Sequence, residues 1–196
     1  MSKKDLLLSV VTAVLTAVFL PPTLQGKGIT ALADVPTYYI YVGYTAVAVI
    51  GMVIAYYLGR AIPILWQLAK FGLVGVLNTA IDFGILNYLS VFAGVTSGTG
   101  LIPIKAVSFS IALVNSYFWN KGWVFEGKKK ANPVSFAIVS ALGIVINVGS
   151  VYVLTTIIGP QGNISPALWL NIANVGATAL SMVWNYMGYK LVVFKK

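Results

Sequence analysis

The chain has 196 residues, of which 59% are hydrophobic and 9% charged, and its formal net charge is +9. A soluble fold of this size cannot bury so much apolar surface, so the composition predicts an integral membrane protein. Cysteine and histidine are absent, which excludes disulfides, thiol chemistry, the usual zinc ligands and the commonest general base. We therefore expect neither an enzyme nor a bound cofactor or metal. The basic residues lie at the ends of apolar runs, which favours anionic lipid over nucleic acid as the partner.

Apolar stretches of transmembrane length recur along the chain, since roughly 20 apolar residues cross a bilayer as a helix. The first stretch covers residues 6–24, and five more cover residues 38–58, 71–93, 104–125, 134–158 and 168–193. For the first, a secretory signal peptide is the alternative to a retained helix, because two lysines precede it and an A-x-A site follows at residues 31–33. We predict an all-α polytopic membrane protein of about six transmembrane helices, two in residues 1–60 and four in residues 61–196.

The distribution of lysine and arginine predicts the orientation of these helices. With a cytoplasmic N-terminus, Lys27 and Lys105 lie outside and the other eleven of the thirteen basic residues lie inside. This predicts a multi-pass protein of the cell membrane with both termini in the cytoplasm. Residues 61–69 are too few to span, and we expect them in the inner interface with Trp66 at headgroup depth.

The second half of the chain contains an internal repeat. "FGLVGVLNTAIDFG" (residues 71–84) aligns without gaps on "FAIVSALGIVINVG" (residues 136–149), which pairs Gly84 with Gly149 and Asp82 with Asn147. Farther on, a shift of 69 superimposes Tyr117, Lys121, Val124 and Phe125 on Tyr186, Lys190, Val193 and Phe194. Each unit, 71–125 and 136–194, reads as a helix, an outer turn and a returning helix, so a pseudo-two-fold axis along the bilayer normal is expected.

The ordered motifs "KFGLVGVLNTAIDFGI", "NSYFWNKGWVF" and "NYMGYKLVVF" resemble the GtrA-like family of small four-helix membrane proteins, over about residues 70–194. The resemblance implies a role in cell-surface polysaccharide synthesis, acting on sugars linked to polyprenyl phosphate. Three functions stay open: flipping such a lipid, anchoring a glycosyltransferase without transport, and exporting a small solute. The chain up to Arg60 lies outside the family pattern, and lysine stands at 121 and 190, where the family often has arginine.

Basic and aromatic residues at the cytoplasmic helix ends form a candidate headgroup site. The lysines predicted to hold the lipid phosphate are Lys70, Lys121 and Lys190. The rings predicted to flank the headgroup at the interface are Trp119, Trp123 and Tyr189. The alternative is that the lysines only snorkel and obey the positive-inside rule.

Amide and carboxylate side chains inside the spans are predicted to line the path of the polar headgroup. They are Asn78, Asp82, Asn115, Asn120, Asn147, Asn171, Asn174 and Asn185. The alternative is that they only join helices by hydrogen bonds. Asp82 is the one acid deep in a span, where an unpaired charge is costly. Its role as a brace, a sugar or ion contact, or a proton-coupling group stays open.

Small residues recur along one side of the second predicted span, at Gly43, Gly51, Ala55 and Gly59. Such spacing predicts close packing against another helix. The partner is the first helix, the four-helix core or a second copy of the chain, so a homo-oligomer stays open.

Overall fold

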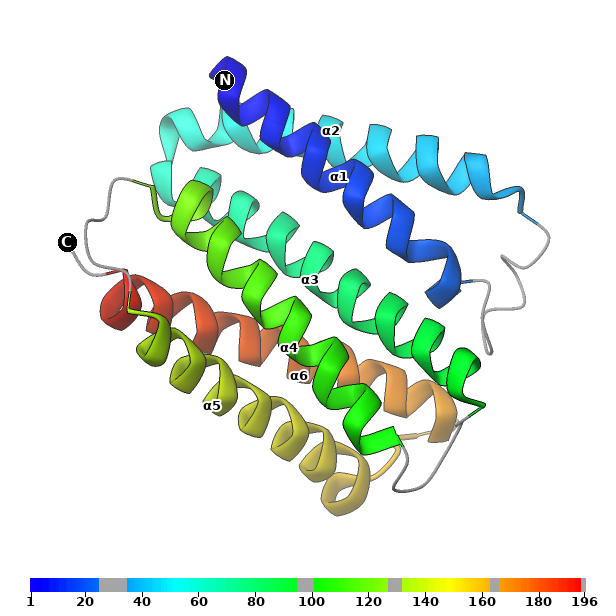
Figure 1. Cartoon of the computed structure of the whole chain (residues 1–196). Coiled ribbons are helices and arrows are strands. Elements are labelled where there is room, and N and C mark those ends of the chain that lie inside the picture. The colour runs from blue at the N-terminus through cyan, green and yellow to red at the C-terminus, as the bar shows by residue number, and fades with distance from the viewer. Residues whose placement is uncertain (25–34, 95–100, 127–131, 163–165, 195–196) are drawn as a thin grey trace. The chain divides into compact units, whose positions relative to one another are not determined.

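The computed structural model describes residues 1–24, 35–94, 101–126, 132–162 and 166–194, and helices make up most of these ranges (Figure 1). The chain divides into two compact units, Met1–Glu126 and Gly127–Lys196, and each is described by itself. The first unit contains α1 (Lys3–Leu24), α2 (Thr37–Ala61), α3 (Pro63–Ala93) and α4 (Leu101–Trp119). The second contains α5 (Pro133–Tyr152) and α6 (Pro166–Gly188). The all-α prediction is confirmed for the described residues.

Two of the described helical segments, Thr37–Ala61 and Pro63–Ile85, are long and apolar enough to cross a membrane. Residues 63–69, which were expected in the inner interface, form the first turns of α3, which begins at Pro63. Ile62 has extended backbone angles, φ −128° and ψ 90°, as a residue before proline prefers. Proline in turn suits the first position of a helix, where its missing N–H costs nothing.

Three helices continue into π-helical turns: η2 (Asn120–Val124) after α4, η3 (Val153–Ile158) after α5 and η4 (Tyr189–Val193) after α6. The turns η2 and η4 end alike. Phe125 N–H donates to the Asn120 carbonyl and Phe194 N–H to the Tyr189 carbonyl, both at 2.8 Å. These equivalent positions are 69 residues apart, which is the shift at which the sequence repeats.

Phenylalanine pairs next to these two turns also have matching geometry in the two units. In the first unit, the rings of Phe71 and Phe125 are 6.4 Å apart at 63°. In the second unit, the rings of Phe136 and Phe194 are 6.3 Å apart at 70°. An edge-to-face phenylalanine pair therefore joins α3 to the end of η2 in the first unit, and α5 to the end of η4 in the second.

In the first unit, α1 lies beside both α2 and α3 (Figure 1). Its buried side consists of small residues, Ser9, Thr12, Ala13, Thr16 and Ala17. The three hydroxyls donate to the carbonyl four residues earlier, at 2.6 to 2.8 Å. Because these hydroxyls are satisfied within α1, the side can approach a neighbouring helix closely. The sequence predicted a small-residue ridge on the second span only, so this set on α1 was missed.

Phe19 packs the C-terminal half of α1 on α3. A Cβ atom added at Gly84 would lie 2.7 Å from Phe19 Cδ1, so the ring lies directly on the glycine. Phe19 also packs against the buried cluster of Leu77, Ile81 and Ala112. The absence of a side chain at Gly84 is thus what admits the ring.

The predicted small-residue ridge of α2 packs closely against another helix at one end. A Cβ atom at Gly59 would lie 2.6 Å from Trp66 Cβ, so Gly59 lets the start of α3 approach α2. Ala55 is half-buried. Gly43 and Gly51 have open space where a Cβ would be. Close packing along the whole ridge is therefore not observed within the described chain.

In the second unit, α5 begins at a proline preceded by a capping residue. Asn132 Oδ1 accepts hydrogen bonds from the backbone N–H groups of Val134 at 2.9 Å and Ser135 at 3.3 Å, which satisfies two of the unpaired donors of the first turn. Near this start, the rings of Phe136 and Tyr189 stack at 4.3 Å and 19°. The stack holds η4 against α5.

Candidate membrane headgroup site

Lys121 and Lys190 carry the same contact in the two units. Lys121 is exposed, and its Nζ lies 5.6 Å from the centre of the Tyr117 ring. Lys190 is half-buried, and its Nζ lies 5.4 Å from the centre of the Tyr186 ring. Lys190 also donates to the Tyr186 hydroxyl at 3.4 Å. Each ammonium is thus held over a tyrosine one turn earlier, at the π-helical end of its unit.

Lys70, the third lysine predicted to bind the phosphate, makes its contacts within the first unit. Its Nζ donates to the Trp123 carbonyl at 3.2 Å, and it lies 5.5 Å and 5.9 Å from the ring centres of Trp66 and Trp123. Gln67 Nε2 donates to the next carbonyl, that of Val124, at 3.0 Å. The two side chains cap the last carbonyls of η2, which have no partner inside the helix. The ammonium of Lys70 is therefore part of the packing of the first unit.

Trp123 is buried, and its indole N–H donates to Asp5 Oδ1 at 2.9 Å. Asp5 also accepts from the Ser2 hydroxyl at 2.7 Å. Burial alone would raise the pKa of Asp5, but the hydrogen bonds from Ser2 and Trp123 and the nearby charge of Lys70 lower it below its ordinary value. Beside this contact, the exposed side chains of Lys4 and Glu126 form an ion pair. The start of α1 is thus attached to η2, and no local sequence pattern indicated this pairing.

The three aromatic rings predicted to flank a headgroup contact other residues of the protein. Trp123 and Tyr189 are buried, and Trp119 is half-buried. The Tyr189 hydroxyl is 2.5 Å from the Ser140 hydroxyl, and Trp119 Nε1 donates to Asn115 Oδ1 at 3.1 Å. Each ring directs its polar atom to a protein partner. Tyr117 and Tyr186 are the rings that contact the lysines.

In the first unit, polar side chains of the predicted path join α3 to α4. Asn115 Nδ2 donates to Asn78 Oδ1 at 2.7 Å, and the Ser108 hydroxyl donates to Asp82 Oδ1 at 2.7 Å. These bonds favour the brace among the three roles left open for Asp82. Asn120 is buried, and its Nδ2 donates to the Ser116 carbonyl at 2.8 Å. Its Oδ1 has no hydrogen-bond partner.

In the second unit, Asn147 Nδ2 donates to the Ser181 hydroxyl at 3.5 Å, which joins α5 to α6. Asn185 lies against Gly143, where an added Cβ would come within 2.9 Å of Asn185 Cγ. The Asn185 Oδ1 is buried without a hydrogen-bond partner. Two further members of the predicted path, Asn171 and Asn174, have side chains outside the described residues.

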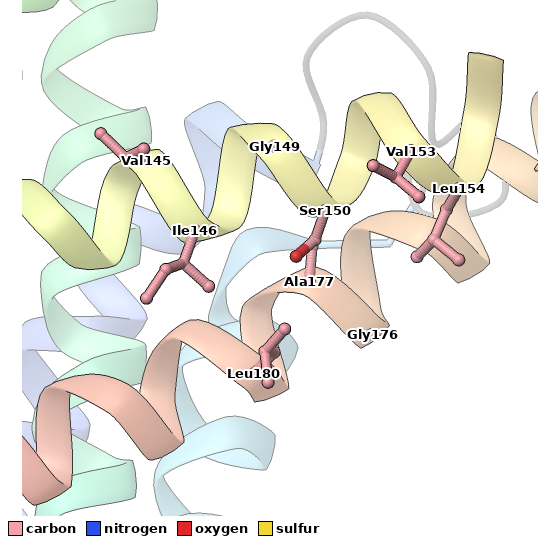
Figure 2. Close-up of a pocket in the computed structure, with 9 residues that line it drawn as sticks. All are labelled: Val145, Ile146, Gly149, Ser150, Val153, Leu154, Gly176, Ala177 and Leu180. Atoms are coloured by element: carbon pink, nitrogen blue, oxygen red, sulfur yellow. The ribbon is translucent and has the colours of Figure 1, made fainter. Parts of the chain in front are cut away.

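Each unit also contains an apolar groove. In the second unit, a groove of about 600 Å³ opens between α5 with η3 on one side and α6 on the other (Figure 2). Ser150 is the one hydroxyl among its lining residues, and Gly149, Gly176 and Ala177 form its small-residue part. In the first unit, a groove of about 610 Å³ lies between α1 and α2, lined by residues such as Ala17, Tyr41 and Ala46.

Long apolar helices, amide pairs between helices and lysine–tyrosine pairs at helix ends define a helical membrane protein. The model of the family described as "GtrA/DPMS, transmembrane domain" matches residues 70–194. The chain belongs to this family. It is also 30% identical over 142 residues to the "Uncharacterized membrane protein YngA" of Bacillus subtilis (strain 168), an alignment that covers 71% of this chain and 88% of YngA. No solved structure matches the chain.

Proposed function

We propose that the protein binds a polyprenyl-phosphate lipid, free or bearing a sugar, and moves it across the membrane during glycan synthesis. The family to which residues 70–194 belong supports a role with polyprenyl-linked sugars. In this proposal the chain is a binding and transport protein rather than an enzyme. It spans the membrane about six times, with both termini in the cytoplasm, as the distribution of lysine and arginine favours.

The observation that carries the proposal is the duplicated lysine–tyrosine pair. Lys121 lies 5.6 Å from the Tyr117 ring centre and Lys190 lies 5.4 Å from the Tyr186 ring centre, each on a π-helical end. A lysine that only snorkels has no need of a fixed ring beneath it. Holding the ammonium over a ring reduces its freedom before a phosphate binds, and leaves its outer side to a charge-assisted hydrogen bond.

Each unit also has an amide oxygen without a hydrogen-bond partner near its lysine, on Asn120 and on Asn185. A buried acceptor left unpaired costs about 1–3 kcal/mol. The hydroxyl of a sugar headgroup, or a water that accompanies it, would pair these oxygens when the helix ends separate. In each unit the lysine then holds a phosphate, and the amide receives the polar group that follows it.

The test is transport in vesicles that contain purified protein and a fluorescent polyprenyl-phosphate-linked sugar. A membrane-impermeant quencher destroys the fluorescence of the outer leaflet, and lipid that moves outward afterward loses its signal too. Wild-type protein should make the whole pool accessible. The double variant Lys121→Ala/Lys190→Ala should slow this by about tenfold or more, since each lost phosphate contact is charge-assisted.

Arg60→Ala is the matched control, because Arg60 is an exposed basic residue outside the matched family region. Its transport rate should equal that of the wild type. Transport that is unaffected by the double variant would refute the lysine site. Absence of transport by folded wild-type protein, together with tight co-purification of a glycosyltransferase, would replace transport by the anchoring function.

A further inference from the structure

Equivalent faces of α3 and α5 differ sharply in exposure. On α3, residues 73, 77, 80 and 84 lie on one side of the helix; Leu73, Leu77 and Ala80 are 9%, 0% and 4% exposed, and Gly84 is buried. At the shift of 65 that aligns the repeats, the matching residues of α5 are Ile138, Leu142, Val145 and Gly149. The first three are 55%, 45% and 67% exposed, and Gly149 is exposed as well. We refer to these four residues as the open face of α5.

What covers the α3 face is the N-terminal helix of the same chain. The Phe19 ring of α1 lies on Gly84 and against Leu77. On α5, a Cβ added at Gly149, the equivalent of Gly84, has no atom within 4 Å. The second unit therefore leaves open the space that a ring fills in the first unit.

The groove of about 600 Å³ lies at the outer end of this face. Val145 and Gly149 belong both to the open face and to the groove lining. Figure 2 shows the neighbouring lining residues Ile146 and Ser150 directed toward α6. A Cβ at Gly176, on the α6 side, would meet nothing closer than Leu154 Cδ1 at 4.0 Å. An apolar strip thus runs along α5 from Ile138 and ends in an apolar groove.

We propose that the open face of α5 and this groove bind the polyprenyl chain of the lipid whose phosphate binds Lys190. This inference rests on the proposed function. Lys190 follows Gly176 by fourteen residues along α6 and η4, which is about 20 Å and about four turns of helix. The two residues therefore lie on roughly the same side. A chain that extends from a phosphate at Lys190 toward the middle of the membrane reaches the groove within the second unit.

The shape of the space favours an isoprenoid chain over other apolar occupants. In the first unit the equivalent position holds a phenylalanine ring, so the space suits a wide, stiff group, and polyprenyl chains carry methyl branches and double bonds. A linear acyl chain is narrower and leaves part of the space unfilled. A partner helix would approach less closely than α1 does on α3, because Val145 replaces Ala80.

The test compares three lipids that differ in their chains, each titrated into purified protein in nanodiscs: a long-chain polyprenyl phosphate, farnesyl phosphate and phosphatidic acid. Gly149→Leu fills the groove without displacing a neighbour. Gly51→Leu is its control, because Gly51 lies in a helix and likewise has no atom within 4 Å of an added Cβ. Thermal unfolding of both variants verifies that each is folded.

We expect Gly149→Leu to weaken binding of the long-chain polyprenyl phosphate by about three- to tenfold. Binding of farnesyl phosphate should not change, since its short chain stays near Lys190. Gly51→Leu should change the binding of neither isoprenoid phosphate. Lys190→Ala should weaken both isoprenoid phosphates.

Equal effects of Gly149→Leu on both isoprenoid phosphates, or no effect on either, would overturn the chain site. An equal loss for phosphatidic acid would make the groove a general acyl-chain site and overturn the isoprenoid assignment. Failure of wild-type protein to bind any isoprenoid phosphate would instead refute the proposed function. A photoreactive polyprenyl phosphate should crosslink to peptides that contain Val145 or Leu154, and crosslinks confined to the first unit would also contradict the site.

Discussion

The indole N–H of Trp123 donates a 2.9 Å hydrogen bond to the carboxylate of Asp5, which lies 118 residues earlier in the chain. Asp5 lies in the first turn of α1, outside the matched family region, and Trp123 lies in η2, inside that region. The same π-helical turn contains Lys121. The N-terminal extension thus helps to position the part of the family domain that carries a proposed phosphate-binding lysine.

Replacing Asp5 tests this attachment. Asp5→Ala removes the acceptor of the Trp123 indole and should lower the free energy of unfolding by about 1 kcal/mol. Asp5→Asn keeps an acceptor oxygen and should cost less. Thermal unfolding in detergent, followed by tryptophan fluorescence, should show stability decreasing from wild type to Asp5→Asn to Asp5→Ala. An equal stability of all three proteins would show that the bond contributes nothing measurable.

The lowered pKa of Asp5 predicts how this contribution depends on pH. Because the folded-state pKa lies below the unfolded value of about 4, ionised Asp5 stabilises the fold at pH values above about 4. That contribution is lost as the pH falls through the lower folded-state pKa. The stability difference between wild type and Asp5→Asn should therefore shrink below about pH 4. The other carboxylates are common to both proteins, so a difference that stays constant would contradict the assignment to Asp5.

Replacing Lys70 should lower stability, and replacing Lys121 should weaken phosphate binding. Lys70→Met removes the donor to the Trp123 carbonyl and should lower the free energy of unfolding by about 1–3 kcal/mol, the cost of a buried acceptor left unpaired. Lys121→Met changes an exposed residue and should leave stability within about 0.5 kcal/mol of wild type.

The matched readout for this pair is binding of farnesyl phosphate. It should weaken in Lys121→Met and persist in Lys70→Met at temperatures where that variant is folded. If binding instead weakens in Lys70→Met and persists in Lys121→Met, Lys70 binds the phosphate and Lys121 only snorkels.

Hydropathy was sufficient to predict the helices, because an apolar run long enough to span a bilayer has few other stable conformations. It could not identify helix partners. The glycines at 43 and 51 looked like a packing ridge, yet they have open space beside them. The ridge that does pack, on α1, consists of serine, threonine and alanine, which hydropathy treats as intermediate.

The sequence indicated the repeated lysines of the candidate site, Lys121 and Lys190, but not the burial of Trp123 and Tyr189. Repetition of Tyr117 and Lys121 at Tyr186 and Lys190 was visible in the sequence, and their contacts follow from the four-residue spacing on a helix. Trp123 looks like an interface anchor by composition, but it is buried and its indole N–H donates to Asp5, a residue distant in sequence. The π-helical turns could not be predicted either, since they follow from packing at the helix ends rather than from a local pattern.

Phe19→Ala should loosen α1 selectively. Its ring fills the space on Gly84 and completes the cluster of Leu77, Ile81 and Ala112, so truncation should cost about 3 kcal/mol. Hydrogen exchange should increase in α1 more than in α4. Val18→Ala is the control, because Val18 is the next residue and is exposed. Similar exchange in the two variants would mean that Phe19 does not fix α1.

The effect of Gly143→Ala on stability should change sign when Asn185 is also replaced. In the wild type, a methyl group at 143 would come within 2.9 Å of Asn185 Cγ, so Gly143→Ala must displace a buried amide and should destabilise the protein by about 1–3 kcal/mol. In an Asn185→Ala background the amide is gone. The same substitution should then stabilise α5 by up to about 1 kcal/mol, the helix preference of alanine over glycine.

The four proteins of this double-mutant cycle give the coupling energy directly from thermal or denaturant unfolding. Gly149→Ala is the matched control, because it replaces a glycine of the same helix that has no neighbour within 4 Å of an added Cβ. Its effect should be the same with and without Asn185. Additive effects of Gly143→Ala and Asn185→Ala would show that the amide does not occupy the space above Gly143. In that case Asn185 Oδ1, which is buried without a hydrogen-bond partner in this structure, would be able to contact the headgroup without separation of the helix ends.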